Sequence, residues 1–470
     1  MHTDTPENHP DPRRCAAAGI GVDRRSCICV HLRAVVLASC CLATSFGCGD
    51  RTVPGDNGIV VVVIDTLRAD HLGAYGYDRP TSPNLDRLAA EGERYHHAFS
   101  QAPWTLPAVA SILTGQLPQV HGAGIGADGD LQPVRPDIRT GAEHLRAAGY
   151  RTGAVVNVEF LEPGSGLARG FEHYDFYASR VSNRGNRDAR QTTDAALSWA
   201  GDIGSEPFFL LVHYFDPHLT YDPPPPYDTL FQPSGTSLIP EGFGTESELF
   251  ALRRGDIELD APQRASLVAR YDGEIRYVDE EFGRLRRGLE ALGRWDRSLV
   301  IVVGDHGEEF WEHGGFEHAH SHHREVLQVP LIVRRPEGSA AVREGRARQI
   351  DILPTMLEYA GLNVSSDLPG RALGEVGMPY SVAAGSLWSG HILSVRSDMG
   401  TLILSPSGVG RFFAPDDQAE TVDVRDRNQQ TAERLEGILR TLPQPTRAPS
   451  PGWELTEQQL QNLRTLGYIR

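Results

Sequence analysis

The decisive stretch of this sequence is Ile59-Val60-Val61-Val62-Val63-Ile64-Asp65, six β-branched residues followed by a carboxylate. A run this short, without polar alternation, is typical of a strand buried on both faces of a parallel sheet. Two further runs of this kind occupy residues 208–212 and 299–303. Together they predict an α/β fold with a large mixed, mostly parallel sheet sandwiched by helices.

Each of these runs stops at residues that can bind a metal or transfer protons. Asp65 follows the first run, His213 the second, and Asp305-His306 the third after one glycine. In open parallel sheets, ligands bind beyond the carboxyl ends of the strands, so we expect the three clusters to converge. Taken singly, each Asp is equally well a helix cap or a turn residue. Taken together, two Asp and a His favour one or two divalent ions, whether zinc, manganese or calcium.

Residues 104–115, Trp-Thr-Leu-Pro-Ala-Val-Ala-Ser-Ile-Leu-Thr-Gly, predict a short helix that begins at Thr105 and stops at Gly115. A hydroxyl at the N-terminus of a helix lies beside free backbone N–H groups, where negative charge is stabilised. Thr105 is therefore a candidate nucleophile. The alternative is a capping threonine without chemistry.

Composition excludes several classes of protein. The chain has 470 residues and a formal charge of −17, and all 45 basic residues are Arg. Because no dense basic run occurs, we expect no nucleic-acid partner. All six cysteines lie at or before Cys48, which excludes a thiol nucleophile, a CxxC zinc site and a disulfide framework in the folded part. We predict no protein partner.

The N-terminal region predicts export. Residues 34–47 are uncharged and follow several Arg, and the stretch is short for a transmembrane span, so residues 1–48 resemble a signal sequence. A small residue before Cys48 favours a lipoprotein of the periplasm or cell envelope, anchored through Cys48, over simple secretion. We further expect a linker at 49–57, a catalytic α/β domain at 58–375, and a C-terminal subdomain with antiparallel strands at 376–470.

Several motifs in order resemble the sulfatase family, within the alkaline phosphatase superfamily. They are Val-Val-Ile-Asp-Thr-Leu-Arg-Ala-Asp-His-Leu-Gly (62–73), Thr-Ser-Pro-Asn-Leu-Asp-Arg-Leu-Ala (81–89), Leu-Thr-Gly (113–115), Pro-Gln-Val-His-Gly (118–122), Gly-Tyr-Arg-Thr (149–152), His-Tyr-Phe-Asp-Pro-His (213–218), Gly-Asp-His-Gly-Glu (304–308), residues 325–332 and Asp-Ile-Leu-Pro-Thr (351–355). The resemblance covers about residue 58 to at least 360. It implies an alkaline phosphatase-like fold and a hydrolase of an anionic ester.

The resemblance breaks at the nucleophile. Formylglycine sulfatases carry Cys or Ser at the head of a C/S-x-P-x-R motif, whereas this chain has Thr105 there and Val109 at the Arg position. Thr cannot yield the formylglycine aldehyde, so the chain looks closer to phosphodiesterases and phosphate transferases of the superfamily that use a metal-bound Thr. The resemblance implies that Asp65, Thr105, Asp305 and His306 hold one ion, with Thr66 where many sulfatases have a second Asp.

Other family positions are also altered. Asn157 and Glu159 stand in the sulfate-binding segment, and His318 replaces a family Lys. We expect His218 or His318 to protonate the leaving oxygen. Asp216, His320 and Asn157 are candidates for a second metal or the substrate, although surface histidines on a polar loop are the alternative. Arg68 either reaches the anion or forms a structural ion pair.

The predicted function is therefore a metal-dependent hydrolase of sulfate or phosphate esters outside the cytoplasm, with Thr105 as nucleophile. Its substrate would be a small-molecule, glycan or lipid ester. A Thr nucleophile slightly favours phosphate esters as substrates, whereas the resemblance to sulfatases favours sulfate esters. A phosphoryl-group transferase and a binding lipoprotein without turnover remain as alternatives.

Overall fold

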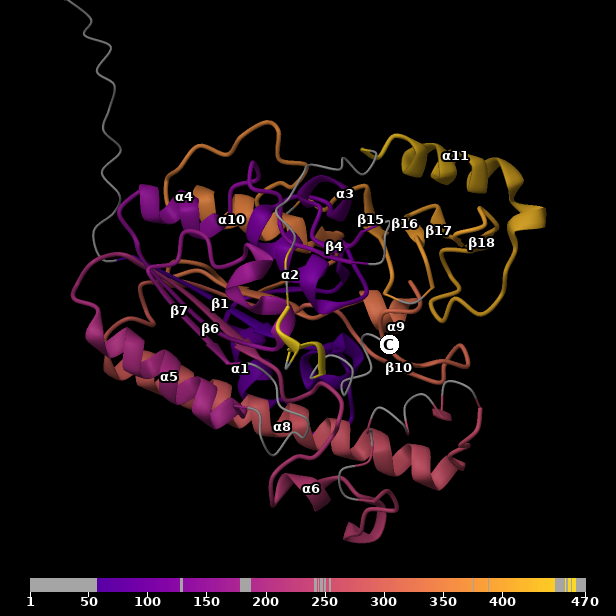
Figure 1. Cartoon of the computed structure of the whole chain (residues 1–470), viewed down its shortest axis with the longest axis horizontal. Helices are drawn as coiled ribbons and strands as arrows, with labels where there is room; N and C mark the ends of the chain where they lie inside the picture. The colour runs from indigo at the N-terminus through magenta and orange to yellow at the C-terminus, as the bar shows by residue number, and fades with distance from the viewer. Residues whose placement is uncertain are drawn as a thin grey trace, which may run out of the picture. The chain divides into compact units, whose positions relative to one another are not determined.

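The central strand of the fold is formed by the apolar run at residues 59–64. The computed structural model describes residues 57–126, 130–177, 187–240, 243, 245, 248, 251–252, 255–374, 376–387, 389–443, 453, 455–457 and 459–461. In it, β1 (Gly58–Ile64) lies inside an eight-stranded sheet of order β13-β2-β12-β9-β1-β8-β6-β7 (Figure 1). The predicted export signal, Cys48 and most of the linker lie outside the described residues.

Most of this sheet is parallel. β1 pairs in parallel with β8 and β9, and β6 pairs in parallel with β8 and β7. On the other side, β12 runs antiparallel to β9 and β2. The strands are β2 (Glu93–Tyr95), β6 (Arg151–Asn157), β7 (His173–Tyr177), β8 (Phe208–Tyr214), β9 (Ser298–Gly304), β12 (Leu331–Arg334) and β13 (Ala341–Arg343).

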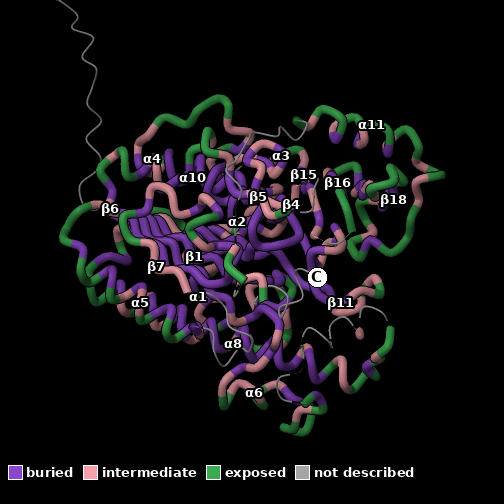
Figure 2. Tube along the Cα trace, in the orientation of Figure 1, coloured by how far each residue is buried: buried purple, intermediate pink, exposed green. Residues whose placement is uncertain are grey.

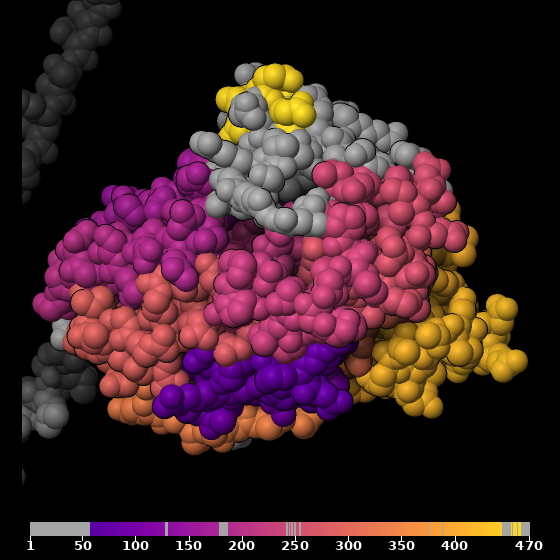
Figure 3. All heavy atoms as spheres, turned by 90° about the horizontal axis from the view of Figure 1, so that it is seen from below, coloured from indigo at the N-terminus to yellow at the C-terminus, as the bar shows by residue number. Residues whose placement is uncertain are grey.

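Helices cover both faces of the sheet. Side chains of β1 point alternately to the two faces, and because all of them are apolar, both faces must be shielded from water. Val61 and Val63 belong to one hydrophobic cluster, whereas Val60 and Val62 belong to another, and all four are fully buried. The strand β1 is coloured as buried in Figure 2. The first cluster includes side chains of α2 (Thr105–Thr114), α4 (Gly141–Ala147) and α10 (Ile352–Tyr359). The second includes side chains of α1 (Pro83–Glu91), α5 (Ala189–Asp202) and α8 (Ala261–Ala291). From below, the indigo segment that carries α1 is part of the outer surface (Figure 3). The predicted layered α/β fold is confirmed.

A smaller antiparallel sheet follows in the C-terminal part. Strands β15 (Tyr380–Ala384), β16 (Leu393–Ser397), β17 (Gly400–Leu404) and β18 (Gly410–Phe413) pair in that order, and α11 (Gln429–Arg440) packs on them. The alternating runs of the sequence predicted antiparallel strands here, and these are confirmed. The exact boundary at residue 376 stays a prediction.

Short elements complete the described chain. They are β3 (Ala98–Phe99), α3 (Pro118–His121), β4 (Gly124–Ile125), β5 (Leu131–Gln132), α6 (Tyr227–Leu230), β10 (Glu309–Phe310), β11 (Phe316–Glu317), α9 (Arg324–Leu327) and β14 (Ala347–Arg348), with 3-10 turns at Ala69–His71, Gly73–Tyr75, Glu159–Leu161, Pro163–Ser165, Pro233–Gly235, Gln349–Asp351 and Arg425–Arg427. Among the described helices, none combines the length and apolar character needed to span a bilayer.

Candidate active site

Two aspartates meet where β1 and β9 end. Ile64 pairs with Gly304 in the parallel register, so Asp65 and Asp305 occupy equivalent positions one residue later. Thr66 turns the chain with a positive φ of 51°, and its backbone N–H donates to Asp305 Oδ1 at 3.1 Å. Both carboxylates are fully buried. The register of two neighbouring strands therefore brings two distant acidic residues together.

Two imidazoles face these carboxylates. His213 Nε2 lies 3.3 Å from Asp65 Oδ2. His306 Nε2 lies 3.5 Å from Asp65 Oδ1 and 3.3 Å from Asp305 Oδ2. In the described part of the chain, neither oxygen of Asp65 accepts a hydrogen bond, and Asp305 Oδ2 accepts none. Buried carboxylate oxygens without donors, beside imidazole nitrogens, are what a divalent cation requires, so the residues fit a metal ion.

The electrostatics of the group agree with this interpretation. Burial, and then the nearby Glu308, raise the pKa of Asp65 well above its usual range. Burial and the neighbouring Asp65 likewise raise the pKa of Asp305. Burial lowers the pKa of His213 to about 3, so this imidazole is neutral. Two buried carboxylates that repel one another, with neutral imidazoles around them, are stabilised by a cation.

Thr105 opens α2 beside the same group. Its hydroxyl Oγ1 lies 3.4 Å from His306 Nε2, and its side chain is fully buried. The helix spans Thr105–Thr114 and ends at Gly115, which has a φ of 63°, as the sequence predicted. The cap residue is Trp104, and it makes no side-chain cap hydrogen bond. Thr105 is thus the first helical residue, and its hydroxyl faces the site.

A second layer of aromatic and acidic side chains surrounds His306. The His318 ring lies 4.4 Å from the His306 ring and 5.0 Å from the His218 ring, centroid to centroid. His318 Nδ1 is 2.9 Å from Glu308 Oε1. Burial raises the pKa of Glu308 to about 7 and lowers that of His218, with help from His318, to about 3. The two predicted proton donors, His218 and His318, therefore both lie near His306, one of the potential metal ligands.

Two further sequence candidates have structural partners. Arg68 donates to Asp70 at 2.7 Å and to Glu312 at 2.5 Å, so it forms the structural ion pair that was the alternative prediction. Asn157 donates to the His213 carbonyl at 2.5 Å and accepts from Arg187 Nε at 2.9 Å. Asn157 therefore holds the backbone of β8 at His213 through this hydrogen bond.

Asp216 and His320 have other surroundings. Asp216 Oδ1 accepts from the Ala189 backbone at the start of α5, and Asp216 lines a cavity of about 550 Å³. Burial raises its pKa to about 7. His320 Nε2 lies 2.8 Å from Glu309 Oε2. Neither residue belongs to a group of three potential ligands within the described residues, and their role at a second metal or at the substrate stays a prediction.

From the sequence, His213 was placed at one of the three converging strand ends but was not named among the ligands of the ion, and Glu308 was given no role. His213 pairs in register with Val63, which faces α2, and the strand alternation places its ring on that same face. That signal was present in the sequence, but it needed knowledge of which face α2 covers. Glu308 belongs to the Gly-Asp-His-Gly-Glu motif, and only the contact with His318 indicates a role.

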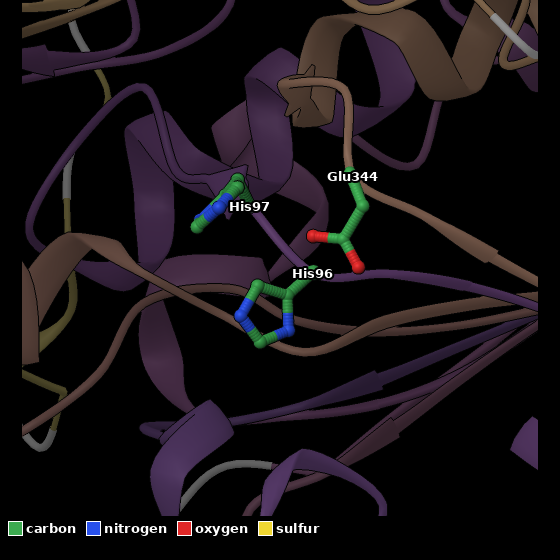
Figure 4. A group of neighbouring side chains, drawn as sticks. All are labelled: His96, His97 and Glu344. Atoms are coloured by element: carbon green, nitrogen blue, oxygen red, sulfur yellow. The ribbon is translucent and has the colours of Figure 1, made fainter. Parts of the chain in front are cut away.

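Two other groups of potential ligands occur among the described residues. His96, His97 and Glu344 come from two segments, and the Glu344 side chain extends toward the histidines (Figure 4). Arg94 Nη1 lies 3.3 Å from His96 Nδ1, which disfavours a cation there. Burial and His96 lower the pKa of His97 to about 4. The other group, Glu309, His313 and Glu325, belongs to the β10–β11 region.

Comparison with known proteins agrees with this geometry. The family model described as Sulfatase matches residues 57–362. An arylsulfatase of Clostridium perfringens is 24% identical over 378 residues, covering 67% of this chain and 77% of that protein. A protein solved with its substrate D-glucosamine-2-N,6-O-disulfate has a TM-score of 0.67 at 20% identity, covering 82% of this chain and 97% of that one. A phosphonate monoester hydrolase of Silicibacter pomeroyi has a TM-score of 0.64 at 21% identity, covering 83% and 96%.

The layered sheet, with potential metal ligands at its carboxyl edge, has the alkaline phosphatase-like fold. Since the Sulfatase family model matches well over half of the sequence, the chain belongs to the sulfatase family. As a member of this family, the protein belongs to the class of sulfuric ester hydrolases.

Proposed function

We propose that this protein is a metal-dependent hydrolase of sulfate or phosphate esters in which Thr105 is the nucleophile. The observation that carries the proposal is the hydroxyl of Thr105 at 3.4 Å from His306 Nε2, beside carboxylates whose oxygens lack donors among the described residues. A capping threonine would instead hydrogen-bond to its own helix, and none of that kind is made here. The position of the Thr105 hydroxyl therefore supports a catalytic role for Thr105 better than a role as a helix cap.

The donor set favours zinc or manganese over calcium. Asp65 and Asp305 offer carboxylate oxygens, whereas His213 and His306 offer imidazole nitrogens. Calcium takes oxygen ligands almost throughout, and imidazole suits transition metals. When bound, such an ion would neutralise the ester oxygens and lower the pKa of a nearby hydroxyl.

The chain's own residues complete the reaction. The Thr105 hydroxyl loses its proton to solvent as Oγ attacks sulfur or phosphorus in line. The bond from that atom to the leaving oxygen breaks, and the sulfuryl or phosphoryl group passes to Thr105. Backbone N–H groups at the start of α2 stabilise the oxygens that gain negative charge. A histidine next to the site gives the leaving oxygen its proton and later takes one from the water that releases the Thr105 ester.

Two comparisons bear on the ester. The arylsulfatase supports sulfate, and the phosphonate monoester hydrolase with a similar fold supports phosphorus chemistry. The unmodified Thr also supports phosphorus, because a Thr ester must be released by direct attack of water. We therefore propose that the site accepts both, with phosphate or phosphonate esters turned over faster.

We also propose that the protein acts outside the cytoplasm. The support is the apolar segment at residues 34–47, followed by Cys48. Labelling with a radioactive fatty acid, compared with a Cys48→Ser variant, tests the anchor: label on both proteins, or on neither, contradicts it.

The test of the activity is a panel of 4-nitrophenyl sulfate, phosphate, phosphodiester and phenylphosphonate esters, assayed with metal-free protein reconstituted with zinc, manganese or calcium. We expect turnover only after reconstitution and fastest with the phosphorus esters. Turnover in the presence of an alcohol, with transfer to that alcohol in place of water, would favour the transferase. No bound metal and no turnover would favour a binding protein.

A further inference from the structure

A cavity of about 550 Å³ lies next to the proposed active site. Phe215 lines this cavity, and its ring centroid also lies 4.5 Å from that of His218 and 6.5 Å from that of His213. Helices α5 and α6 both pack against α8 around it (Figure 1). Cavities of this size hold small-molecule ligands, so this one is a candidate subsite for the part of the ester that leaves.

Acidic side chains outnumber basic ones in the wall of this cavity. The carboxylates that line it are those of Asp188, Asp216, Asp222, Asp228 and Glu274, and the guanidiniums are those of Arg187 and Arg270. A ligand that enters the cavity therefore meets a surplus of negative charge.

Both guanidiniums already have protein acceptors. Arg187 pairs with the carboxylate of Asp175 at 2.8 Å, and its other two nitrogens also donate to protein oxygens. Arg270 donates from its three nitrogens to a serine hydroxyl and two carbonyls of residues 237–240. Neither arginine therefore pairs directly with a carboxylate of the cavity.

Two of these carboxylates are short of donors. Glu274 is 3% exposed, and the one hydrogen bond that it accepts within the described chain comes from the Asp222 N–H to Oε1 at 2.8 Å. Asp216 Oδ1 accepts from the Ala189 N–H at 2.8 Å, whereas its buried Oδ2 accepts from none of the described residues. Burial, and then the nearby Asp216, raise the pKa of Glu274 above its usual range. Buried acids are normally paired, so this pair is suited to a cation.

The rest of the wall favours an organic cation over an inorganic one. Phe215 and Tyr277 contribute aromatic rings, and the prolines at 223–225 add apolar surface. Aromatic faces attract an ammonium group, and carboxylates accept its N–H groups. A metal ion requires several ligand atoms close together, and Asp216 and Glu274 belong to no such group in the part of the chain that the structure describes.

We propose that this cavity is the subsite for the alcohol part of the ester, and that this alcohol carries an ammonium group bound by Asp216 and Glu274. This inference rests on the proposed hydrolase function. The sulfate or phosphate group lies at the metal ligands, the alcohol extends past Phe215, and its ammonium nitrogen donates to the two carboxylates. The same surplus of negative charge repels an alcohol that carries a second anionic group. The site therefore selects a zwitterionic ester over a polyanionic one.

The experiment compares three matched phosphate or sulfate esters, whose phenyl ring carries a 4-aminomethyl, a 4-ethyl or a 4-carboxymethyl group. The aminomethyl and ethyl groups have nearly the same shape, so the difference between them measures the effect of the charge. For the wild type, we expect kcat/KM to be about 10- to 100-fold higher with the aminomethyl ester than with the ethyl one, and lowest with the carboxymethyl ester. The difference should lie mainly in KM, because the ammonium group is remote from the reacting atoms.

The variants Glu274→Gln and Asp216→Asn should each lower the ratio between the aminomethyl and ethyl esters by roughly tenfold. The matched control is Glu280→Gln, which removes the same charge from α8. The Glu280 side chain is 46% exposed, pairs with Arg276 at 3.4 Å and does not line the cavity. We expect the control to keep the ratio of the wild type. An equal loss in the control, or an unchanged ratio in both cavity variants, would overturn the inference.

Binding of the free alcohols, 4-(aminomethyl)phenol and 4-ethylphenol, is measured by calorimetry and needs no turnover. If the wild type hydrolyses no ester but binds the aminomethyl compound more tightly, and Glu274→Gln does not, the proposed function fails and the ammonium site stands. If the wild type hydrolyses all three esters without preferring the aminomethyl one, only this inference fails. Loss of a bound metal ion in Glu274→Gln would also overturn it, in favour of an inorganic cation. If Glu274→Gln does not fold, Asp216→Asn decides each comparison.

Discussion

Two groups of acidic and histidine residues in this molecule have similar composition but opposite hydrogen bonding. The first is Asp65, His213 and Asp305 at the edge of the central sheet, and the second is Glu309, His313 and Glu325 around the β10–β11 hairpin. Each could hold a cation by distance alone. Their carboxylates differ in whether they already have donors.

In the hairpin group, the polar atoms have protein partners. His313 Nδ1 lies 2.7 Å from Glu325 Oε1, and its Nε2 lies 3.0 Å from the Ala419 carbonyl. Glu309 Oε1 accepts from the backbone N–H groups of His313 and Gly315. Although burial opposes it, Glu325 raises the pKa of His313, and both ring nitrogens face acceptors, so the surroundings favour the doubly protonated ring.

The edge group shows the opposite pattern, because Asp65 and Asp305 Oδ2 accept no hydrogen bond within the described chain. Distance between potential ligands therefore does not separate a metal centre from an ion-pair network. The supply of hydrogen-bond donors does. We therefore expect the hairpin group to stabilise the fold and the edge group to hold the ion of the proposed function.

The largest expected effect lies at the edge group. Thr105→Ala should lower kcat by roughly a thousandfold or more, because no other group replaces the nucleophile. Bound metal, measured by mass spectrometry, should fall little, since two carboxylates and two imidazoles stay in place. Activity equal to the wild type in this variant would exclude Thr105 as nucleophile.

Removing a ligand should separate the two groups next. Asp305→Asn should weaken metal binding by at least about 100-fold, since losing even an orienting partner costs 10- to 100-fold. Chelation should lower the melting temperature of the wild type but hardly change that of the variant. Full metal content in Asp305→Asn would show that the edge group is not the site.

The hairpin group should respond in stability instead. His313→Gln removes a charged donor between Glu325 and Ala419, and we expect a loss of about 1–3 kcal/mol in the free energy of unfolding. Metal content per chain should equal that of the wild type. A lower metal content in His313→Gln, at equal folding, would mean that the hairpin also binds an ion.

The smallest effect is a dependence on pH. Although burial opposes it, Glu309 raises the pKa of His320 and His320 lowers that of Glu309. A His whose pKa is higher in the folded state stabilises the protein fully below its ordinary pKa of about 6.5, and that contribution is lost as the pH rises through the folded value. Between pH 6 and pH 9, the melting temperature of the metal-bound wild type should therefore fall by roughly 1–3 °C more than that of Glu309→Gln. If the melting temperatures of the two proteins fell equally with pH, the Glu309–His320 pair would make no pH-dependent contribution to stability.

The sequence allowed most of the fold and part of the site to be predicted. Continuous apolar runs identified β1, β8 and β9 because a parallel strand buried on both faces carries no polar alternation. The same runs pointed to Asp65, Asp305 and His306, since parallel strands end on one edge. Thr105 was found through the stop signal at Gly115 and the family motif.

The remaining assignments depend on contacts that a sequence does not show. Arg68 was ambiguous because its partner Glu312 lies far along the chain, and only folding brings them within 2.5 Å. His318 and His320 are two residues apart on one loop, yet one ring packs on His306 and the other pairs with Glu309. The positive φ of Ala319, between them, is not encoded by any residue preference, because tertiary contacts impose it.

The hydrogen bond from Thr66 to Asp305 joins residues 239 positions apart. During synthesis, the ribosome must add all of the intervening chain before the second carboxylate exists. An unfinished N-terminal fragment would therefore lack one carboxylate of the proposed metal site, however much of its early sheet has formed. In the proposed function, the ion would therefore bind only after residue 305 has been added and the edges of β1 and β9 have met.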